Sequence, residues 1–197
     1  MLNPSRNSRG FTLFELVTTL VIFAALVTMA IPNFSRWIAN SQVRSVSEAL
    51  QNGLRLAEAE SVRRNRRIQF SLTNGTPSTL PATAINGSNW MIVTVPLITS
   101  STGTLEPAEM VEGGQFNSVA SNVQITTLDS SASPASFATV TFSPLGRPVP
   151  NLGPTYPVTF KVSISRGDRP LDVLLSAGGE VRLCDPSQAN TSLSLGC

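Results

Sequence analysis

The sequence predicts an α+β fold in which one long N-terminal helix packs on a mainly antiparallel β head. Two observations lead to this class. The chain has 197 residues, and its first third carries an uncharged apolar run followed by apolar residues at three- and four-residue steps, the spacing of a helix. From about residue 66 the apolar residues alternate in short segments joined by Ser, Thr, Gly and Pro, which is typical of short strands.

The composition excludes several classes of function. Lys and Arg total 14 against 12 Asp and Glu, 13% of residues are charged and 41% are hydrophobic. These values fit neither a disordered polyelectrolyte nor a uniformly basic nucleic-acid binder. Histidine is absent and Lys161 is the single lysine, so the chain has no Ser-His-Asp triad, His-ligated metal or P-loop lysine. We therefore expect no metal and no cofactor.

The first 35 residues contain a segment long enough to span a membrane. No charged residue occurs in the twenty residues from Leu16 to Ser35, and about twenty apolar residues cross the hydrocarbon layer as a helix. Arg6 and Arg9 precede this run and place the N-terminus on the cytoplasmic side, with the rest of the chain outside. The run is longer than that of a secretory signal and lacks an Ala-x-Ala site at its end.

The segment GFTLFELVTTLVIFAALVTMAIPNF resembles the class III signal and first helix of type IV pilins and type II secretion pseudopilins. The resemblance implies a prepilin leader over residues 1–10, cleavage by a prepilin peptidase between Gly10 and Phe11, and methylation of the new amino group of Phe11. It also implies a transmembrane and assembly helix over residues 11–37. Pro32 stands at the proline that is usual in the family, where its missing N–H is expected to bend the helix.

Glu15 becomes the fifth residue of the mature chain under this resemblance. A carboxylate just inside the bilayer is unfavourable unless it is paired, and the nearest cation would be the amino group of a neighbouring subunit's Phe11. Glu15 would then set the register of assembly. The alternative is that Glu15 only caps the start of the helix, where the helix dipole favours negative charge.

Residues 38–65 are predicted to continue the helix to about Arg64 as an amphipathic half that packs on the head. Its apolar positions recur at helical spacing: Val43, Val46, Leu50, Leu54 and Ala57. The basic run RRNRR at residues 63–67 has two interpretations. Its cations could stabilise the negative end of the helix dipole, or they could bind phosphate or anionic lipid.

Residues 66–197 are predicted to form a β-rich periplasmic head. The expected strands are Arg67–Leu72, Trp90–Val95, Val123–Thr127, Phe137–Phe142, Val158–Ile164, Leu171–Leu175 and Glu180–Leu183. The polar connections 73–88 and 96–121 are expected to be exposed loops that could recognise neighbours.

Three features of the head resemble the GspH/FimT/FimU group of minor pilins and pseudopilins, and favour a FimU-like minor pilin. They are the strand around Trp90, the segment FSPLGRP from Phe142 to Pro148, and the tail GGEVRLCDP from Gly178 to Pro186. Phe142 is expected to point inward, Gly146 to permit a tight turn, and Gly178-Gly179 to form a two-residue hairpin turn.

The two cysteines, Cys184 and Cys197, lie near the C-terminus. Outside the membrane the default interpretation is a disulfide, which would pin the tail to the last strand. A C-terminal disulfide is also common in minor pilins that resemble this chain, and it favours the pilus member of the group over the secretion member.

A pair of carboxylates is the remaining route to catalysis. The candidates are Glu106, Glu109, Glu112, Asp129, Asp168, Asp172 and Asp185. Nothing in the sequence brings two of them together. The three glutamates lie in a Pro- and Gly-rich loop and are expected to be exposed to solvent. We therefore expect no enzymatic activity.

The sequence favours a minor pilin of a type IV pilus that assembles through its N-terminal helix and helps to prime or cap the filament. Its expected partners are other minor pilins, the major pilin, the prepilin peptidase, the inner-membrane assembly platform and the lipid bilayer. It would cross the bacterial inner membrane once, with a periplasmic head, before it enters the pilus or pseudopilus.

Two alternatives remain. One is a type II secretion minor pseudopilin of the H type. The other is a minor pilin that binds DNA during uptake, with Arg147, Arg166 and Arg169 as candidate contacts. The Gly-Arg-x-Arg element of DNA-binding FimT members is not matched, because Pro148 follows Arg147, and Asp168 separates Arg166-Gly167 from Arg169.

Overall fold

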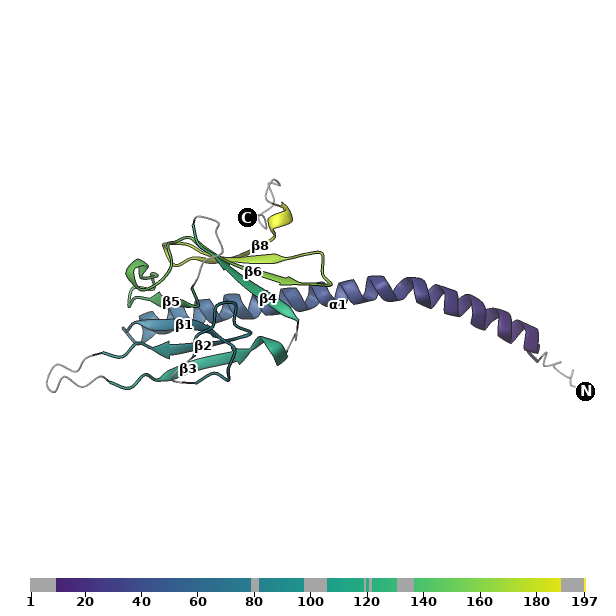
Figure 1. The fold of residues 1–197 in the computed structure, drawn as a ribbon, viewed down its shortest axis with the longest axis horizontal. Helices are drawn as coiled ribbons and strands as arrows, with labels where there is room; N and C mark the ends of the chain where they lie inside the picture. The colour runs from purple at the N-terminus through teal and green to yellow at the C-terminus, as the bar shows by residue number, and fades with distance from the viewer. Residues whose placement is uncertain are drawn as a thin grey trace, which may run out of the picture.

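The computed structural model describes residues 10–78, 82–97, 106–118, 120, 122–130, 137–188 and 197. A single helix, α1 (Leu13–Arg63), dominates it. Its 51 residues correspond to roughly 76 Å at 1.5 Å per residue. The C-terminal half lies within the head, while the N-terminal half projects from it (Figure 1).

The head contains two four-stranded antiparallel sheets. One has the order β3-β2-β1-β5 and the other the order β4-β6-β7-β8. The strands are β1 (Ile68–Thr73), β2 (Asn89–Thr94), β3 (Met110–Gln115), β4 (Val123–Leu128), β5 (Thr139–Phe142), β6 (Val158–Ile164), β7 (Leu171–Leu175) and β8 (Val181–Cys184). Three short 3₁₀ helices, η1 (Phe116–Ser118), η2 (Pro150–Leu152) and η3 (Pro186–Gln188), complete the described elements.

The amphipathic half of α1 runs between the two sheets (Figure 1) and packs against strands of both. Its five predicted apolar positions are all buried in one core with side chains from both sheets. Across this core, the rings of Phe70 on β1 and Phe160 on β6 meet edge to face at 6.5 Å. The predicted fold class, a long helix on antiparallel β structure, is therefore confirmed.

The prediction that residues 96–121 form a loop is wrong, because this segment contains β3 and η1. β3 is an edge strand whose residues are half-buried or exposed, so its sequence, MVEGGQ, lacks a buried apolar alternation. Its glycines serve packing: a Cβ on Gly114 would lie 2.6 Å from Nε1 of Trp90. The strand is therefore built to accommodate the tryptophan of β2.

Several predicted boundaries move by one or two residues. The helix begins at Leu13 rather than Phe11, and β5 begins at Thr139 rather than Phe137. The hairpin between β7 and β8 also differs from the prediction. Ser176 N–H donates to the carbonyl of Glu180, so the loop has three residues, 177–179, and Gly179 adopts the left-handed φ of 100° that such a loop requires.

Two predictions about local residues of the head are confirmed. Phe142 is fully buried. Gly146 has a φ of 74°, and its N–H donates to the carbonyl of Ser143, which makes the tight turn that the sequence predicted.

Candidate assembly surface

The N-terminal half of α1 exposes a continuous apolar surface. Fourteen large hydrophobic side chains between Leu13 and Ile38 are exposed, from Leu13 at 82% to Ile38 at 38%. Within it, an 18-residue window is apolar and long enough to cross a membrane, and none of it is buried. Burial begins at Ala39. An apolar surface of this extent marks a membrane or protein interface.

The start of α1 has an N-cap hydrogen bond. Thr12 is the N-cap, and its Oγ1 accepts a hydrogen bond from the N–H of Glu15 at 3.3 Å. Glu15 lies in the first turn and is exposed. Its position fits capping, and its exposed side chain also leaves it available to a neighbour. The proposed cleavage residues Gly10 and Phe11 precede the helix and are exposed.

The helix is continuous across Pro32, so this proline does not end it. The projecting half of α1 is curved rather than straight (Figure 1). The proposed kink at Pro32 itself remains a prediction.

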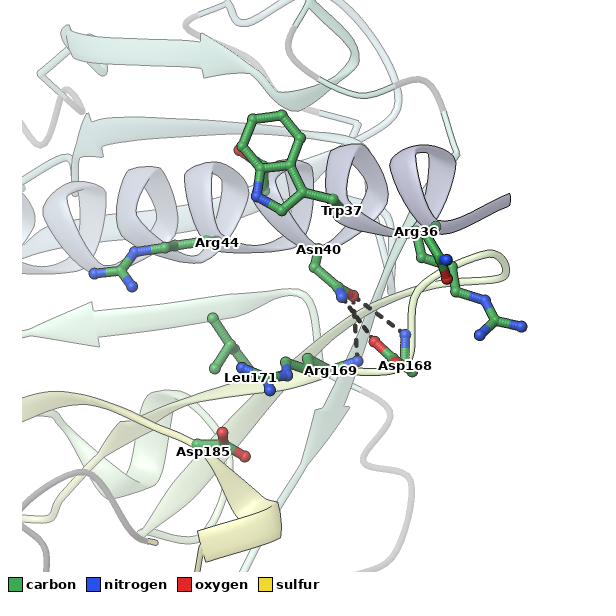
Figure 2. Close-up of a pocket in the computed structure, with 10 residues that line it drawn as sticks. Arg36, Trp37, Asn40, Arg44, Asp168, Arg169, Leu171 and Asp185 are labelled. Carbon is green, nitrogen blue, oxygen red and sulfur yellow. Dashed lines mark hydrogen bonds between the residues drawn. The ribbon is translucent and has the colours of Figure 1, made fainter. Parts of the chain in front are cut away.

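The point where α1 leaves the head is fixed by Asn40. Its Nδ2 donates to Oδ1 of Asp168 at 2.7 Å, and its Oδ1 accepts from the N–H groups of Asp168 and Arg169 at 3.2 and 3.3 Å. Figure 2 shows Asn40 reaching from the helix toward the turn between β6 and β7. The bond to Asn40 holds the pKa of Asp168 below its ordinary value, with Arg169 and Arg36 adding to the effect.

The contact between Asn40 and the β6–β7 turn is not predicted from the sequence. Asn40 and Asp168 are separated by 128 positions, and a half-buried asparagine on a helix has no sequence signal. The sequence signal that indicates a close approach here is Gly167. A Cβ there would lie 2.6 Å from the Ile164 side chain and 3.0 Å from Oδ1 of Asn40, so the turn needs glycine in order to approach the helix.

The three candidate nucleic-acid contacts do not form one cluster. Arg166 and Arg169 lie on the turn beside Asn40. Arg147 follows Gly146, whose neighbours are Val62 and Glu58 in the last turns of α1. The eighteen residues from Asn40 to Glu58 correspond to about 27 Å of helix. The structure thus divides the candidate site between opposite ends of the head.

The basic run at residues 63–67 is largely paired. Glu60 receives bonds from Arg63 and Arg64 at 2.6 and 2.7 Å. Arg64 also bonds Glu109 at 2.7 Å, and Arg66 bonds Glu106 at 2.7 Å. These ion pairs tie the end of α1 to the segment before β3, which supports the structural interpretation of the run.

Two of the glutamates expected to be solvated, Glu106 and Glu109, are thus ion-paired. Among the other candidate carboxylates, Asp172 on β7 is buried, and burial raises its pKa. Asp185, which follows the Cys184 that pairs with Asp172 across β7 and β8, raises this pKa further through its charge. Among the residues that the structure describes, no three Asp, Glu, Cys or His side chains form a cluster that could hold a metal.

The cysteines form the disulfide Cys184–Cys197, with Cα atoms 5.3 Å apart. It connects the end of β8 to the last residue of the chain. The predicted disulfide is therefore present in the structure.

Comparisons with known proteins identify the family of this chain. The family model of the type II transport protein GspH matches residues 46–179, more than half of the chain. The chain belongs to the GspH family. A model of the prokaryotic N-terminal methylation motif also matches residues 5–31. The prediction of a GspH/FimT/FimU-group protein is confirmed, and both the minor pilin and the pseudopilin interpretations fit it.

Solved structures of GspH-type proteins are similar to this chain at low identity. The type IV minor pilin FimU of Pseudomonas aeruginosa shares 19% identity, with 73% of this chain and 89% of that chain covered and a TM-score of 0.49. The minor pseudopilin EpsH of Vibrio cholerae shares 11% identity, covering 74% and 98%, with a TM-score of 0.47. Escherichia coli GspH shares 13%, covering 79% and 95%, with a TM-score of 0.45. A search of curated proteins finds no match.

The family and the N-terminal motif indicate a membrane-anchored protein of a pilus or pseudopilus, processed by a prepilin peptidase and assembled with other pilins.

Proposed function

We propose that this chain is a minor pilin of a type IV pilus, anchored in the bacterial inner membrane with its head in the periplasm, that helps to prime or cap the filament. It polymerises and catalyses no reaction. The leader is removed between Gly10 and Phe11, and Phe11 is methylated. The mature helix then joins a bundle of pilin helices.

The observation that carries this proposal is the exposed N-terminal half of α1. The head buries its own core, whereas the described side chains between Leu13 and Ile38 are exposed, apart from the half-buried Thr18. A bilayer covers this surface before assembly, and the helices of neighbouring subunits cover it in a filament. One element can serve both states because both environments are apolar.

Glu15 is the charged residue of this surface that determines how neighbouring helices align. It is the single charged side chain from Phe11 to Ser35. In an apolar surrounding it gains most by meeting the amino group of a neighbouring Phe11. A helix that slides along its neighbour by one turn would lose this contact, so the pair defines the register.

The C-terminal disulfide favours the pilus over the secretion machine, because such a bridge is common in the minor pilins that this chain resembles. The secretion pseudopilin remains the second candidate, because the same helix and head fit it. No feature of the described residues favours DNA binding, since the three candidate arginines lie at two ends of the head.

The test is complementation of a deletion strain, with surface pili and secreted protein measured in parallel. Wild type is expected to restore pili, and Glu15→Ala is expected to fail although the protein is present in the membrane. Glu48→Ala is the matched control, since Glu48 is a half-exposed carboxylate that pairs only with its helical neighbour Arg44. A deletion that loses secretion and keeps pili would assign the chain to the secretion machine.

A further inference from the structure

An open groove of about 650 Å³ lies where α1 leaves the head. It is lined by the helix from Asn33 to Arg44, by the turn between β6 and β7, and by Asp185 beyond β8. Three arginines border it, Arg36, Arg44 and Arg169 (Figure 2). The groove begins on the assembly surface, at Asn33, Arg36 and Trp37, and extends to charged residues that apolar packing of the helix does not use.

The groove lies at a definite depth once the helix is in a membrane. The uncharged run from Leu16 to Ser35 covers about 30 Å, the thickness of the hydrocarbon layer. For a helix along the membrane normal, Arg36 follows at its edge and Asn40 lies about 6 Å further out, within the headgroup layer. Trp37 is 66% exposed at the same level, where tryptophan is enriched in membrane proteins.

Asn40 brings a second source of positive charge to this depth. Its three hydrogen bonds hold the β6–β7 turn against the helix, so Arg169 lines the same groove as Arg36. Figure 2 shows the side chain of Arg36 extending toward the N-terminal half of α1, that is, toward the bilayer. Arg44 extends in the opposite direction along the helix and pairs with Glu48 at 2.9 Å.

The arginines at headgroup depth are available to a ligand. Arg36 and Arg169 are exposed, and within the described part of the chain neither has an ion pair within 4 Å. Two carboxylates also line the groove. Asp168 bonds Asn40 and attracts Arg169 and Arg36, and Asp185 bonds the N–H and hydroxyl of Ser187. Guanidinium groups bind phosphate oxygens through paired N–H donors.

We propose that this groove binds the phosphate of an anionic phospholipid headgroup on the periplasmic face of the membrane. The bound lipid fixes the depth and rotation of the subunit before it enters a filament. This inference rests on the membrane insertion of the proposed function. Asn40 is a positioning residue in it, because it holds the turn that carries Arg169.

The test uses the full mature chain in nanodiscs with equal phosphatidylglycerol and phosphatidylcholine. Native mass spectrometry then counts the lipids retained by the released protein. Wild type is expected to retain phosphatidylglycerol preferentially. Arg36→Gln and Arg169→Gln should each lower this preference by about fivefold, the electrostatic contribution of one arginine near an anionic surface. Arg182→Gln, an exposed arginine of β8 outside the groove, should leave the preference unchanged.

Equal retention of the two lipids by wild type, or an unchanged preference in the double variant, would overturn the inference. Displacement of the lipid by millimolar inorganic phosphate would also overturn it and assign the groove to free phosphate. A dimer that the double variant loses would assign it to a second copy. A chain that fails to enter nanodiscs refutes the membrane function, whereas a chain that enters them without preference refutes this inference alone.

Discussion

At the scale of residues, Glu60 shows how the end of the helix is stabilised. It accepts two hydrogen bonds from Arg63, at 2.8 and 2.6 Å, and one from Arg64 at 2.7 Å. These bonds from Arg63 and then Arg64 lower the pKa of Glu60 from 4.5 to about 2. A carboxylate with three charge-assisted bonds favours its ionised form.

This arrangement predicts a pH dependence. Because the folded pKa of Glu60 lies below the unfolded value, its contribution to stability is present above pH 4.5 and is lost as the pH falls toward about 2. In a carboxyl NMR titration of the full chain in micelles, Arg63→Gln should raise the pKa of Glu60 toward 4.5, and Arg182→Gln should not. A Glu60 that already titrates near 4.5 in wild type would show that these bonds do not form in solution.

At the scale of elements, the sequence predicted those strands whose residues alternate between core and surface. β6 is an example, since Val158, Phe160 and Val162 are buried and the residues between them are not. β3 was not predicted because no residue in it is fully buried and its glycines are typical of a loop. The contact between Asn40 and Asp168 was not predicted because these residues come together only in the folded chain.

The role of the β3 glycines can be tested directly. Gly114→Ala places a methyl group within 3 Å of the Trp90 ring, and such overpacking costs about 1 to 3 kcal/mol. Urea unfolding of the full chain should show this loss. Gly75→Ala is the matched control, because its nearest neighbouring atom lies at 3.7 Å. Equal stability of the two variants would mean that β3 shifts freely away from Trp90.

The disulfide gives a second prediction for an element. Cys184 and Cys197 are 13 positions apart, and closing a loop of this size in the unfolded chain stabilises the fold by about 3 kcal/mol. Cys197→Ser should lower the free energy of unfolding by this amount. Reductant should bring wild type to the same value and leave the variant unchanged. A variant as stable as oxidised wild type would show that the tail adds nothing to the head.

At the scale of the whole molecule, the chain consists of a completed head and an uncovered helix. The sequence predicted this division from the change at residue 36, where an uncharged run gives way to amphipathic spacing. It could not predict that the helix would run between two sheets, because strand pairing over long separations leaves no local pattern. The division itself requires a partner for residues 13–38, since water is a poor environment for this surface.

We propose that the chain assembles through this uncovered helix, with Glu15 setting the register. The most direct measurement places a photo-reactive residue at Val21, which is 62% exposed, in native cells. Adducts with other pilin-type proteins are expected in wild type and Glu48→Ala, and their loss is expected in Glu15→Ala at equal protein level. Adducts with lipid alone in wild type, or protein adducts that persist in Glu15→Ala, would contradict it.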